Sequence, residues 1–247
     1  CGAFRGHGTV NVRFAFESLL DEMARELGLD PFAVRRANLL KAPTFTLNDL
    51  MVNSYGLPEC LDIVEKASGW KDRKGKLPPL RGLGVACSHY VSGASKPVNW
   101  TGEPHATVNI KLDFDGSLTI LTGAPEIGQG SSTILTQCVA EVLGLDVTRI
   151  RILTSDSLVT PKDNGAYSSR VTYMVGNAAI DAATNLKAIL VEAAARKMDV
   201  LPEDVECLGE VYRAGSQDQG MSFEEVVVAA LEGTGTITAR GNFDTIP

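Results

Sequence analysis

A glycine-rich stretch is the part of the sequence best suited to holding a ligand. It reads Gly-Ala-Pro-Glu-Ile-Gly-Gln-Gly-Ser-Ser-Thr over residues 123–133. Because Gly128 and Gly130 lack side chains, another molecule can approach the backbone closely there. Gln129 carries an amide that both donates and accepts hydrogen bonds, which suits a cofactor rich in nitrogen and oxygen atoms. Glu126 is expected to accept hydrogen bonds from nearby backbone N–H groups rather than to act in catalysis.

A helix is expected to begin directly after this stretch. Residues 131–144 carry apolar side chains at helical spacing. The free backbone N–H groups and the positive dipole end of such a helix would point towards the glycines. The helix start therefore favours an anionic ligand such as a phosphate.

A second glycine motif, Phe4-Arg5-Gly6-His7-Gly8, stands just before another predicted helix. The planar fork of Arg5 suits two-pronged contact with a phosphate or an oxo group, and the flanking glycines leave room for a bulky ligand. A tight turn in which Arg5 pairs with a surface acid is the alternative. His7 is equally compatible with a packed or solvated position.

A long polar loop over residues 154–169 is the third candidate site. Its last part reads Thr-Pro-Lys-Asp-Asn-Gly-Ala-Tyr-Ser-Ser-Arg over residues 160–170. Ser168 and Ser169 stand where hydroxyl and backbone donors could face an anion at the start of the next helix. Loops longer than about 12 residues without structure of their own are often functional. The alternative is a solvent-exposed connection in which Ser169 caps the helix.

The rest of the sequence predicts the elements that must position these residues. Asp30-Pro31 reads as a helix N-cap and first helical residue, Gly28 as the residue that ends the helix before it, and Ser222 to Glu225 as a capping box. Helical and alternating patterns predict helices over 9–27, 31–40, 58–67, 131–144, 170–197 and 223–231, and strands over 81–90, 105–112, 117–121, 148–153 and 236–240. The basic, proline-containing run 71–81 resembles a linker, and its charges are expected to be solvated rather than to bind an acidic substrate tail. The fold class is α+β, in two segments.

Composition argues against several classes of protein. The formal net charge is −7 and no dense block of Lys and Arg occurs, which argues against nucleic-acid binding. No apolar run reaches the roughly 18–20 residues needed to span a membrane. The five cysteines are scattered and none forms a CxxC pair, so neither a disulfide framework nor a local metal or iron–sulfur site is indicated, and a reducing cytoplasm fits best. The sequence begins inside a glycine motif, and we interpret it as an internal piece of a longer polypeptide.

Three motifs together resemble the molybdenum-binding subunit of the xanthine dehydrogenase (molybdenum hydroxylase) family. They are FRGHG at residues 4–8, EIGQG at 126–130 and GAYSSR at 165–170. Their order and separations fit that family across essentially the whole chain. Within the family, the segments at residues 8–14, 46–55, 88–93 and 100–106 are most similar to the alpha subunits of 4-hydroxybenzoyl-CoA reductases. The resemblance implies mixed sheets with packed helices, as parts of two molybdenum-cofactor-binding subdomains over residues 1–75 and 76–247.

The resemblance also implies a molybdenum cofactor carrying molybdopterin cytosine dinucleotide. Arg5 and Gly6 would lie near the oxo side of the metal and the pterin phosphate, and Phe4 and His7 would line the substrate approach, where many relatives have an aromatic residue in place of His7. The other implied cofactor contacts are Gly128, Gln129 and Gly130 for the pterin, Ser131, Ser132 and Thr133 for the dinucleotide, and Ser168 and Ser169 on the far side. The family's glutamate base is expected beyond Pro247, which leaves Arg5 as the catalytic residue expected here, with no direct metal ligand.

A hetero-oligomeric oxidoreductase is the implied whole. Iron–sulfur subunits and a flavin-type subunit would carry electrons from a low-potential donor such as ferredoxin, because the isolated cysteines here cannot ligate a cluster. The expected reaction removes the para hydroxyl of an aromatic CoA thioester reductively, giving benzoyl-CoA. The alternatives are oxidative hydroxylation of an aldehyde or N-heterocycle, and a non-catalytic cofactor-binding or assembly protein. The fragment alone is expected to be inactive.

Overall fold

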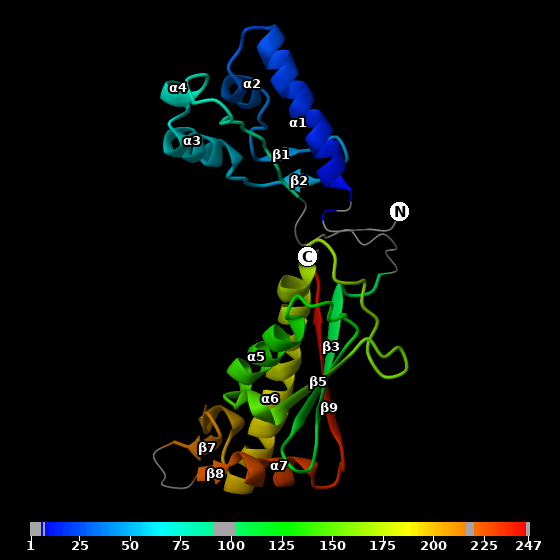
Figure 1. The fold of residues 1–247 in the computed structure, drawn as a ribbon. Coiled ribbons are helices and arrows are strands. Elements are labelled where there is room, and N and C mark those ends of the chain that lie inside the picture. Colours follow the sequence, from blue (N-terminus) through cyan, green and yellow to red (C-terminus); the bar gives the residue numbers. More distant parts are fainter. Residues whose placement is uncertain (1–5, 7, 91–101, 216–219, 246–247) are drawn as a thin grey trace. The chain divides into compact units, whose positions relative to one another are not determined.

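The computed structural model describes residue 6 and residues 8–90, 102–215 and 220–245. The chain forms two compact units, residues 1–90 and residues 91–247 (Figure 1), and each is described by itself. The predicted linker at residues 71–81 is wrong, because this segment belongs to the first unit and follows Trp70, which is buried in that unit's core. The assignment of residues 1–75 and 76–247 to two cofactor-binding subdomains stays a prediction.

The first unit is mainly helical. Its elements are α1 (Thr9–Glu26), α2 (Pro31–Ala37), β1 (Thr44–Phe45), β2 (Met51–Val52), α3 (Leu57–Ser68) and α4 (Trp70–Arg73). The three helices predicted here are confirmed, although α2 ends at Ala37 instead of residue 40. The β1–β2 pair and the single turn of α4 were missed, because elements this short contain too few residues to show a period.

Local signals close α1 and open α2 as expected. Gly28 has a φ of +65°, and the backbone N–H of Leu29 donates to the carbonyl of Ala24 at 2.8 Å, which is the glycine-terminated helix end. The side chain of Asp30 accepts hydrogen bonds from two backbone N–H groups of the next turn, and Pro31 takes the first helical position. The sequence therefore fixes where these two helices meet.

A small core holds the first unit together. Phe32, Leu61 and Trp70 are buried, and the rings of Phe32 and Trp70 meet edge to face at 4.9 Å. Burial would raise the pKa of Asp30, but a hydrogen bond from the Trp70 indole and bonds from backbone N–H groups outweigh it and lower the pKa. Residues 81–90 do not form the predicted strand, because no strand lies beside them. They run extended, and three alternate side chains pack on the core: Leu83, Val85 and Cys87.

A buried ion pair ties this extended segment to α1 and α2. Arg35 and Glu17 are 3% and 8% exposed, and their charged atoms lie 2.7 Å apart. Asp21 also pairs with Arg35, at 2.9 Å. The backbone N–H of Cys87 donates to the Glu17 carboxylate at 3.0 Å. The pair is thus satisfied from three segments of the first unit.

The second unit is built on a four-stranded sheet in the order β5-β4-β3-β9. β4 and β5 are parallel, and β3 pairs antiparallel with β4 and with β9. The strands are β3 (Ala106–Leu112), β4 (Leu118–Thr122), β5 (Ile150–Thr154) and β9 (Ile237–Phe243), and the helices are α5 (Ser131–Leu143), α6 (Gly176–Met198) and α7 (Phe223–Leu231). A smaller antiparallel sheet contains β6 (Val205–Leu208), β7 (Val211–Ala214) and β8 (Gly220–Ser222).

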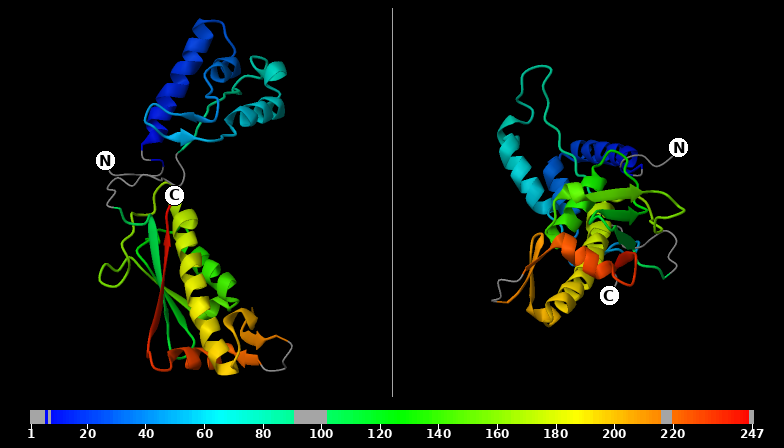
Figure 2. Two further views of the ribbon diagram at one scale, coloured as in Figure 1. Left: turned by 180° about the vertical axis from the view of Figure 1, so that it is seen from behind. Right: turned by 90° about the horizontal axis from the view of Figure 1, so that it is seen from below.

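Alternation in the sequence determines which face of the large sheet is buried. Ala106, Val108, Ile110 and Leu112 are all buried, as the period of two predicts. α6 crosses β3 and β9 on this face, with α5 beside it (Figure 2). Gly241 of β9 permits this close packing, because a Cβ atom there would overlap the backbone of α6.

Most elements of the second unit agree with the sequence predictions to within a few residues. The capping box at the start of α7 is present in full. The helix expected from residue 170 begins as a π-helical turn, Val171–Val175, before it becomes α6. The sheet β6-β7-β8 was missed, because its strands are three or four residues long. In the parts of the chain that the structure describes, no helix combines the length and apolar character needed to cross a membrane.

Candidate functional site

Two of the three predicted motifs lie at one edge of the large sheet. Because β4 and β5 are parallel, both strands end at the same edge. The glycine loop, residues 123–130, follows β4, and the long loop, residues 155–169, follows β5. Ligands of such sheets commonly bind beyond the carboxyl ends of the strands. This topology brings Gly128 to Thr133 and Ser168 to Ser169 to the same end of the second unit.

The carboxylate of Glu126 occupies the start of α5. It accepts hydrogen bonds from the backbone N–H groups of Gly128 at 2.8 Å, Gly130 at 3.1 Å and Ser132 at 3.0 Å, and from the Ser131 hydroxyl at 3.2 Å. The bond from Ser132 is the largest of the effects that lower the pKa of Glu126 to about 2; loss of hydration raises the pKa, but the bonds from Ser132, Gly130, Gly128 and Ser131 together outweigh it. The supporting role predicted for Glu126 is confirmed. The expectation of free N–H groups here is wrong for these three donors, since the anion that they hold is a side chain of the loop itself.

The amide of Gln129 also bonds within the loop. Its nitrogen donates to the carbonyl of Pro125 at 2.8 Å and to the Ser131 hydroxyl at 2.9 Å. Its oxygen accepts from the backbone N–H of Ile127 at 2.6 Å. Gln129 therefore shapes the turn, and any further contact that it makes uses the second lone pair of its oxygen or an exchange of partners.

The two central glycines leave an open peptide surface. Gly128 and Gly130 have φ values of +92° and +78°, which residues with a Cβ atom rarely adopt. A Cβ atom built on either glycine would meet nothing within 4 Å. The loop thus leaves the peptide groups of Gly128 and Gly130 uncovered by side chains, so a flat ligand could lie against them.

The glycine loop and the long loop touch at Gly123. A Cβ atom on Gly123 would overlap the carbonyl oxygen of Pro161 and would lie 2.9 Å from the Cβ of Asp163. Within the long loop, Asp163 accepts from the backbone N–H of Gly165 at 2.7 Å. The end of β4 and the long loop are consequently packed backbone to backbone, which only glycine at position 123 allows.

The two predicted serines of the long loop are conformationally unusual. Ser168 and Ser169 have φ values of +52° and +53°, in the left-handed region that non-glycine residues rarely adopt. The π-helical turn follows after Arg170. Strained backbone and π-helical turns both recur at functional sites.

A buried arginine and its partners were missed by the sequence predictions. Arg170, which ends the GAYSSR motif, is 1% exposed and pairs with Asp163 at 3.1 Å. It also donates to the backbone carbonyl of His105, which directly precedes β3. The Nδ1 atom of His105 lies 2.8 Å from the hydroxyl of Thr245, and its buried Nε2 atom has no hydrogen-bond partner among the described residues. In the sequence, the feature that could have indicated this buried arginine is the position of Arg170 at the start of an otherwise apolar helix.

The first motif lies largely outside the described residues, including Phe4, Arg5 and His7. Gly6 has a φ of +90°, and its carbonyl accepts from the backbone N–H of Thr9 at 2.9 Å. The helix predicted to follow the motif is confirmed as α1, which begins at Thr9. It belongs to the first unit, and the other two motifs belong to the second.

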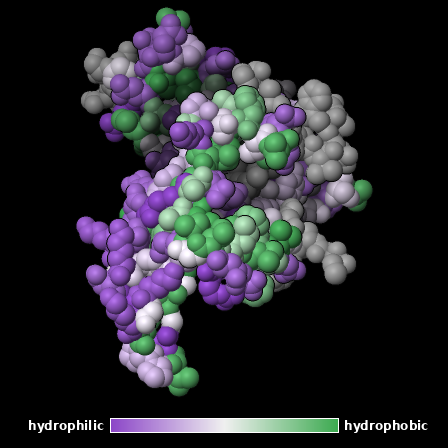
Figure 3. All heavy atoms as spheres, turned by 90° about the horizontal axis from the view of Figure 1, so that it is seen from above, coloured by the Kyte–Doolittle hydropathy of each residue, from purple (hydrophilic) through white to green (hydrophobic). Residues whose placement is uncertain are grey.

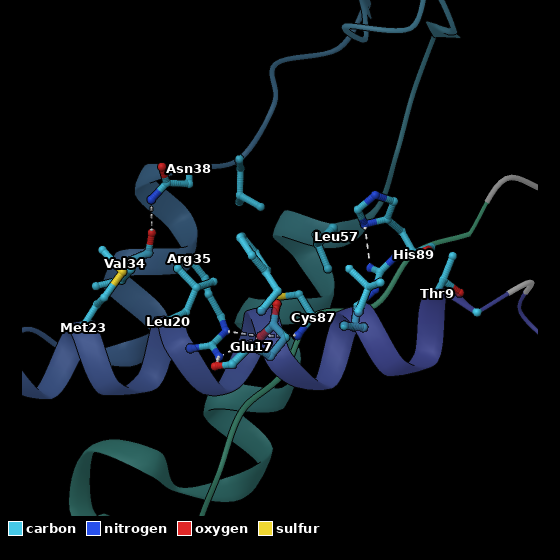
Figure 4. Close-up of a pocket in the computed structure, with 15 residues that line it drawn as sticks. Thr9, Glu17, Leu20, Met23, Val34, Arg35, Asn38, Leu57, Cys87 and His89 are labelled. Carbon is cyan, nitrogen blue, oxygen red and sulfur yellow. Dashed lines mark hydrogen bonds and ion pairs between the residues drawn. The ribbon is translucent and has the colours of Figure 1, made fainter.

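A groove of about 1010 Å³ also lies in the first unit (Figure 4). One wall is formed by α1, where Val12 and Phe16 are 71% and 56% exposed. The Glu17–Arg35 pair lines the groove. Nearer the start of α1, Arg13 and His89 also line it, with the Nη1 atom of Arg13 3.2 Å from the Nδ1 atom of His89. Hydrophobic side chains likewise reach the surface on the face drawn in Figure 3. None of the described residues predicted to bind the cofactor lines this groove.

No cluster of three or more His, Cys, Asp or Glu side chains suited to a metal ion occurs in the described parts of the chain.

Residues 63–247 match the sequence pattern of the family described as "Molybdopterin cofactor-binding domain", and residues 1–39 match a second pattern with the same description. The chain therefore belongs to the molybdopterin cofactor-binding domains of the xanthine dehydrogenase-type molybdenum hydroxylases.

Individual relatives agree with this family. The chain is 38% identical over 201 residues to the xanthine dehydrogenase molybdenum-binding subunit of Escherichia coli O157:H7, covering 78% of this chain and 26% of that protein. It is 31% identical over 215 residues to the nicotine 6-hydroxylase large subunit of Paenarthrobacter nicotinovorans, covering 83% and 26%. The crystal structure of quinoline 2-oxidoreductase from Pseudomonas putida 86 matches with a TM-score of 0.73 at 25% identity, covering 98% and 34%. The chain thus spans about a quarter of the length of these curated relatives, and the predicted α+β cofactor-binding fold is confirmed.

Proposed function

We propose that this chain forms part of the catalytic subunit of a molybdenum-dependent oxidoreductase and holds one side of its pterin cofactor. The observation that carries the proposal is the convergence of two loops at the carboxyl ends of β4 and β5. One loop offers open glycine backbone and the other offers two strained serines. Membership of the molybdopterin cofactor-binding family supports the same role.

Each predicted site residue receives a role in this proposal. Gly128, Gln129 and Gly130 contact the pterin, Ser131, Ser132 and Thr133 bind the dinucleotide, and Ser168 and Ser169 complete the opposite side. We assign Arg5 and Gly6 to the metal and the pterin phosphate, and Phe4 and His7 to the substrate. We assign the cytosine dinucleotide form of the cofactor. When bound, this cofactor supplies the redox chemistry, and the protein supplies its binding and orientation.

The substrate class that we favour is an N-heterocycle or aldehyde, hydroxylated oxidatively. Xanthine, nicotine and quinoline, in the names of the three relatives described above, are all nitrogen heterocycles. Because the chain covers about a quarter of the curated relatives, the base of the reaction and most of the substrate pocket belong to the rest of the protein. Iron–sulfur and flavin-type partner subunits then exchange electrons with the cofactor.

A 4-hydroxybenzoyl-CoA reductase is the second candidate. The segments at residues 8–14, 46–55, 88–93 and 100–106 favour it by their similarity to that branch of the family. In this case the aromatic CoA thioester loses its para hydroxyl as water, and a low-potential donor such as ferredoxin supplies the electrons. A non-catalytic assembly protein is the third alternative, which the retained glycine and serine motifs disfavour.

Substrate assays with the whole purified complex separate these candidates. We expect hydroxylation of quinoline, nicotine, xanthine or an aldehyde in the presence of an artificial electron acceptor. Conversion of 4-hydroxybenzoyl-CoA to benzoyl-CoA with reduced ferredoxin, without any such hydroxylation, would replace our first candidate with the second. A complex that contains the cofactor and converts neither group would refute both.

A further inference from the structure

The buried arginine at the end of the long loop makes more contacts than a capping residue needs. The guanidinium of Arg170 donates to both carboxylate oxygens of Asp163 at 3.1 Å, and to the carbonyl of Gly165, also at 3.1 Å. It reaches the carbonyl of His105, and its Nε atom lies 3.3 Å from the sulfur of Met174. One side chain thus joins the long loop, the residue that precedes β3 and the π-helical turn.

The partner of this arginine is buried as well. The side chain of Asp163 is 4% exposed and that of Arg170 is 1% exposed. An isolated charge at such a position is costly, so each residue stabilises the other and neither is dispensable alone. The backbone of Asp163 also contacts Gly123 at the end of β4. The pair therefore connects the long loop to the glycine loop.

The pair lies directly beside the strained serines. A left-handed backbone conformation is unfavourable for any residue other than glycine. Two in succession persist only where the surroundings determine the backbone on both sides. Asp163 and Gly165 lie in the loop before Ser168 and are hydrogen-bonded to each other, and Arg170, the residue after Ser169, donates to both of them. The ion pair thus closes the segment at both ends.

We propose that Arg170 and Asp163 are positioning residues that hold the Ser168–Ser169 wall in its cofactor-binding conformation. This inference rests on the proposed function, because the ligand of the wall is the pterin cofactor. Neither residue contacts the cofactor in this account. Replacing a residue that holds a binding residue in place, without touching the bound group itself, typically changes the affinity for that group about 10- to 100-fold. We therefore expect the pair to control how long the cofactor stays bound.

The test uses the whole protein with its partner subunits. Arg170→Met removes the fork and leaves Asp163 buried without its partner, while Arg170→Lys keeps the charge but loses the planar set of donors. The double variant Asp163→Asn with Arg170→Met leaves no buried charge without a partner, so it decides the outcome if Arg170→Met does not fold. Arg149→Met is the matched control. Arg149 also pairs with two carboxylates, Glu210 and Glu224, but it directly precedes β5, at the opposite edge of the sheet.

Two measurements decide the outcome. The first is the rate at which pterin and molybdenum are released from the loaded protein, which we expect to rise about 10- to 100-fold in the Arg170 variants and in the double variant, but not in Arg149→Met. The second is hydrogen exchange over residues 160–175, which we expect to speed up in the same variants. Wild-type release rates and exchange in Arg170→Met and in the double variant would overturn the positioning role. A wild-type protein that holds no molybdenum would instead overturn the proposed function.

Discussion

The carboxylate of Glu126 lies 3.0 Å from the backbone nitrogen of Ser132, in the first turn of α5. This bond and those from Gly128 and Gly130 lower the pKa of Glu126 from 4.5 to about 2. A carboxylate whose pKa is lowered on folding stabilises the folded state above the unfolded pKa. That contribution is complete above pH 4.5 and is lost as the pH falls towards 2.

Glu126→Gln should therefore loosen the glycine loop in a pH-dependent way. At pH 6 we expect faster hydrogen exchange over residues 123–135 in the variant than in the wild type. The difference should shrink as the pH falls from 4.5 towards 2, where the wild-type carboxylate also becomes neutral. Glu141→Gln, on the exposed face of the same helix, is the control and should change little. A difference that stays constant with pH would mean that the carboxylate charge does not hold the loop.

Gly241→Val should separate β9 from α6. A Cβ atom at position 241 would lie 2.7 Å from the Cα of Ala182 and would overlap nearby backbone atoms. Overpacking of this kind typically destabilises by about 1–3 kcal/mol. Hydrogen exchange over residues 176–198 and 237–243 should speed up in the variant. Gly82→Ala adds a Cβ atom where nothing lies within 4 Å, and equal effects of both changes would contradict the packing argument.

Arg35→Met should destabilise the first unit strongly. The substitution leaves Glu17 buried without the partner that lies 2.7 Å away, and breaking a buried pair from one side costs about 3–5 kcal/mol. We expect rapid proteolysis within residues 9–40 of the whole protein. Arg25→Met breaks an exposed pair at 3.9 Å and should cost about 0–1 kcal/mol. Equal resistance of the two variants to protease would show that the pair is dispensable.

The sequence was sufficient where local chemistry determines structure. Gly28 and Asp30 marked the junction of two helices, and the alternation from Ala106 to Leu112 marked a half-buried strand. The support role of Glu126 followed from its position before a glycine-flanked helix start. In each case the deciding contacts lie within a few residues of one another in the chain.

The sequence did not predict features that depend on contacts between residues far apart in the chain. Residues 81–90 alternate like a strand, but they pack on helices and have no neighbour to pair with. The burial of Arg170 depends on Asp163 and on the carbonyl of His105, 65 positions away. The strain at Ser168 and Ser169 leaves no mark in composition. Such features arise only when the loops after β4 and β5 come together at one edge of the sheet.

We propose that the loops after β4 and β5 hold a molybdenum–pterin cofactor. The most direct test is the molybdenum and pterin content of the whole protein, purified with its partner subunits and then denatured to release bound groups. We predict stoichiometric molybdenum together with a pterin that carries a cytosine nucleotide, and a marked loss of both in Gln129→Ala. Absence of molybdenum and pterin from an intact, folded complex, purified from cells grown with ample molybdate, would show that these loops do not hold the cofactor.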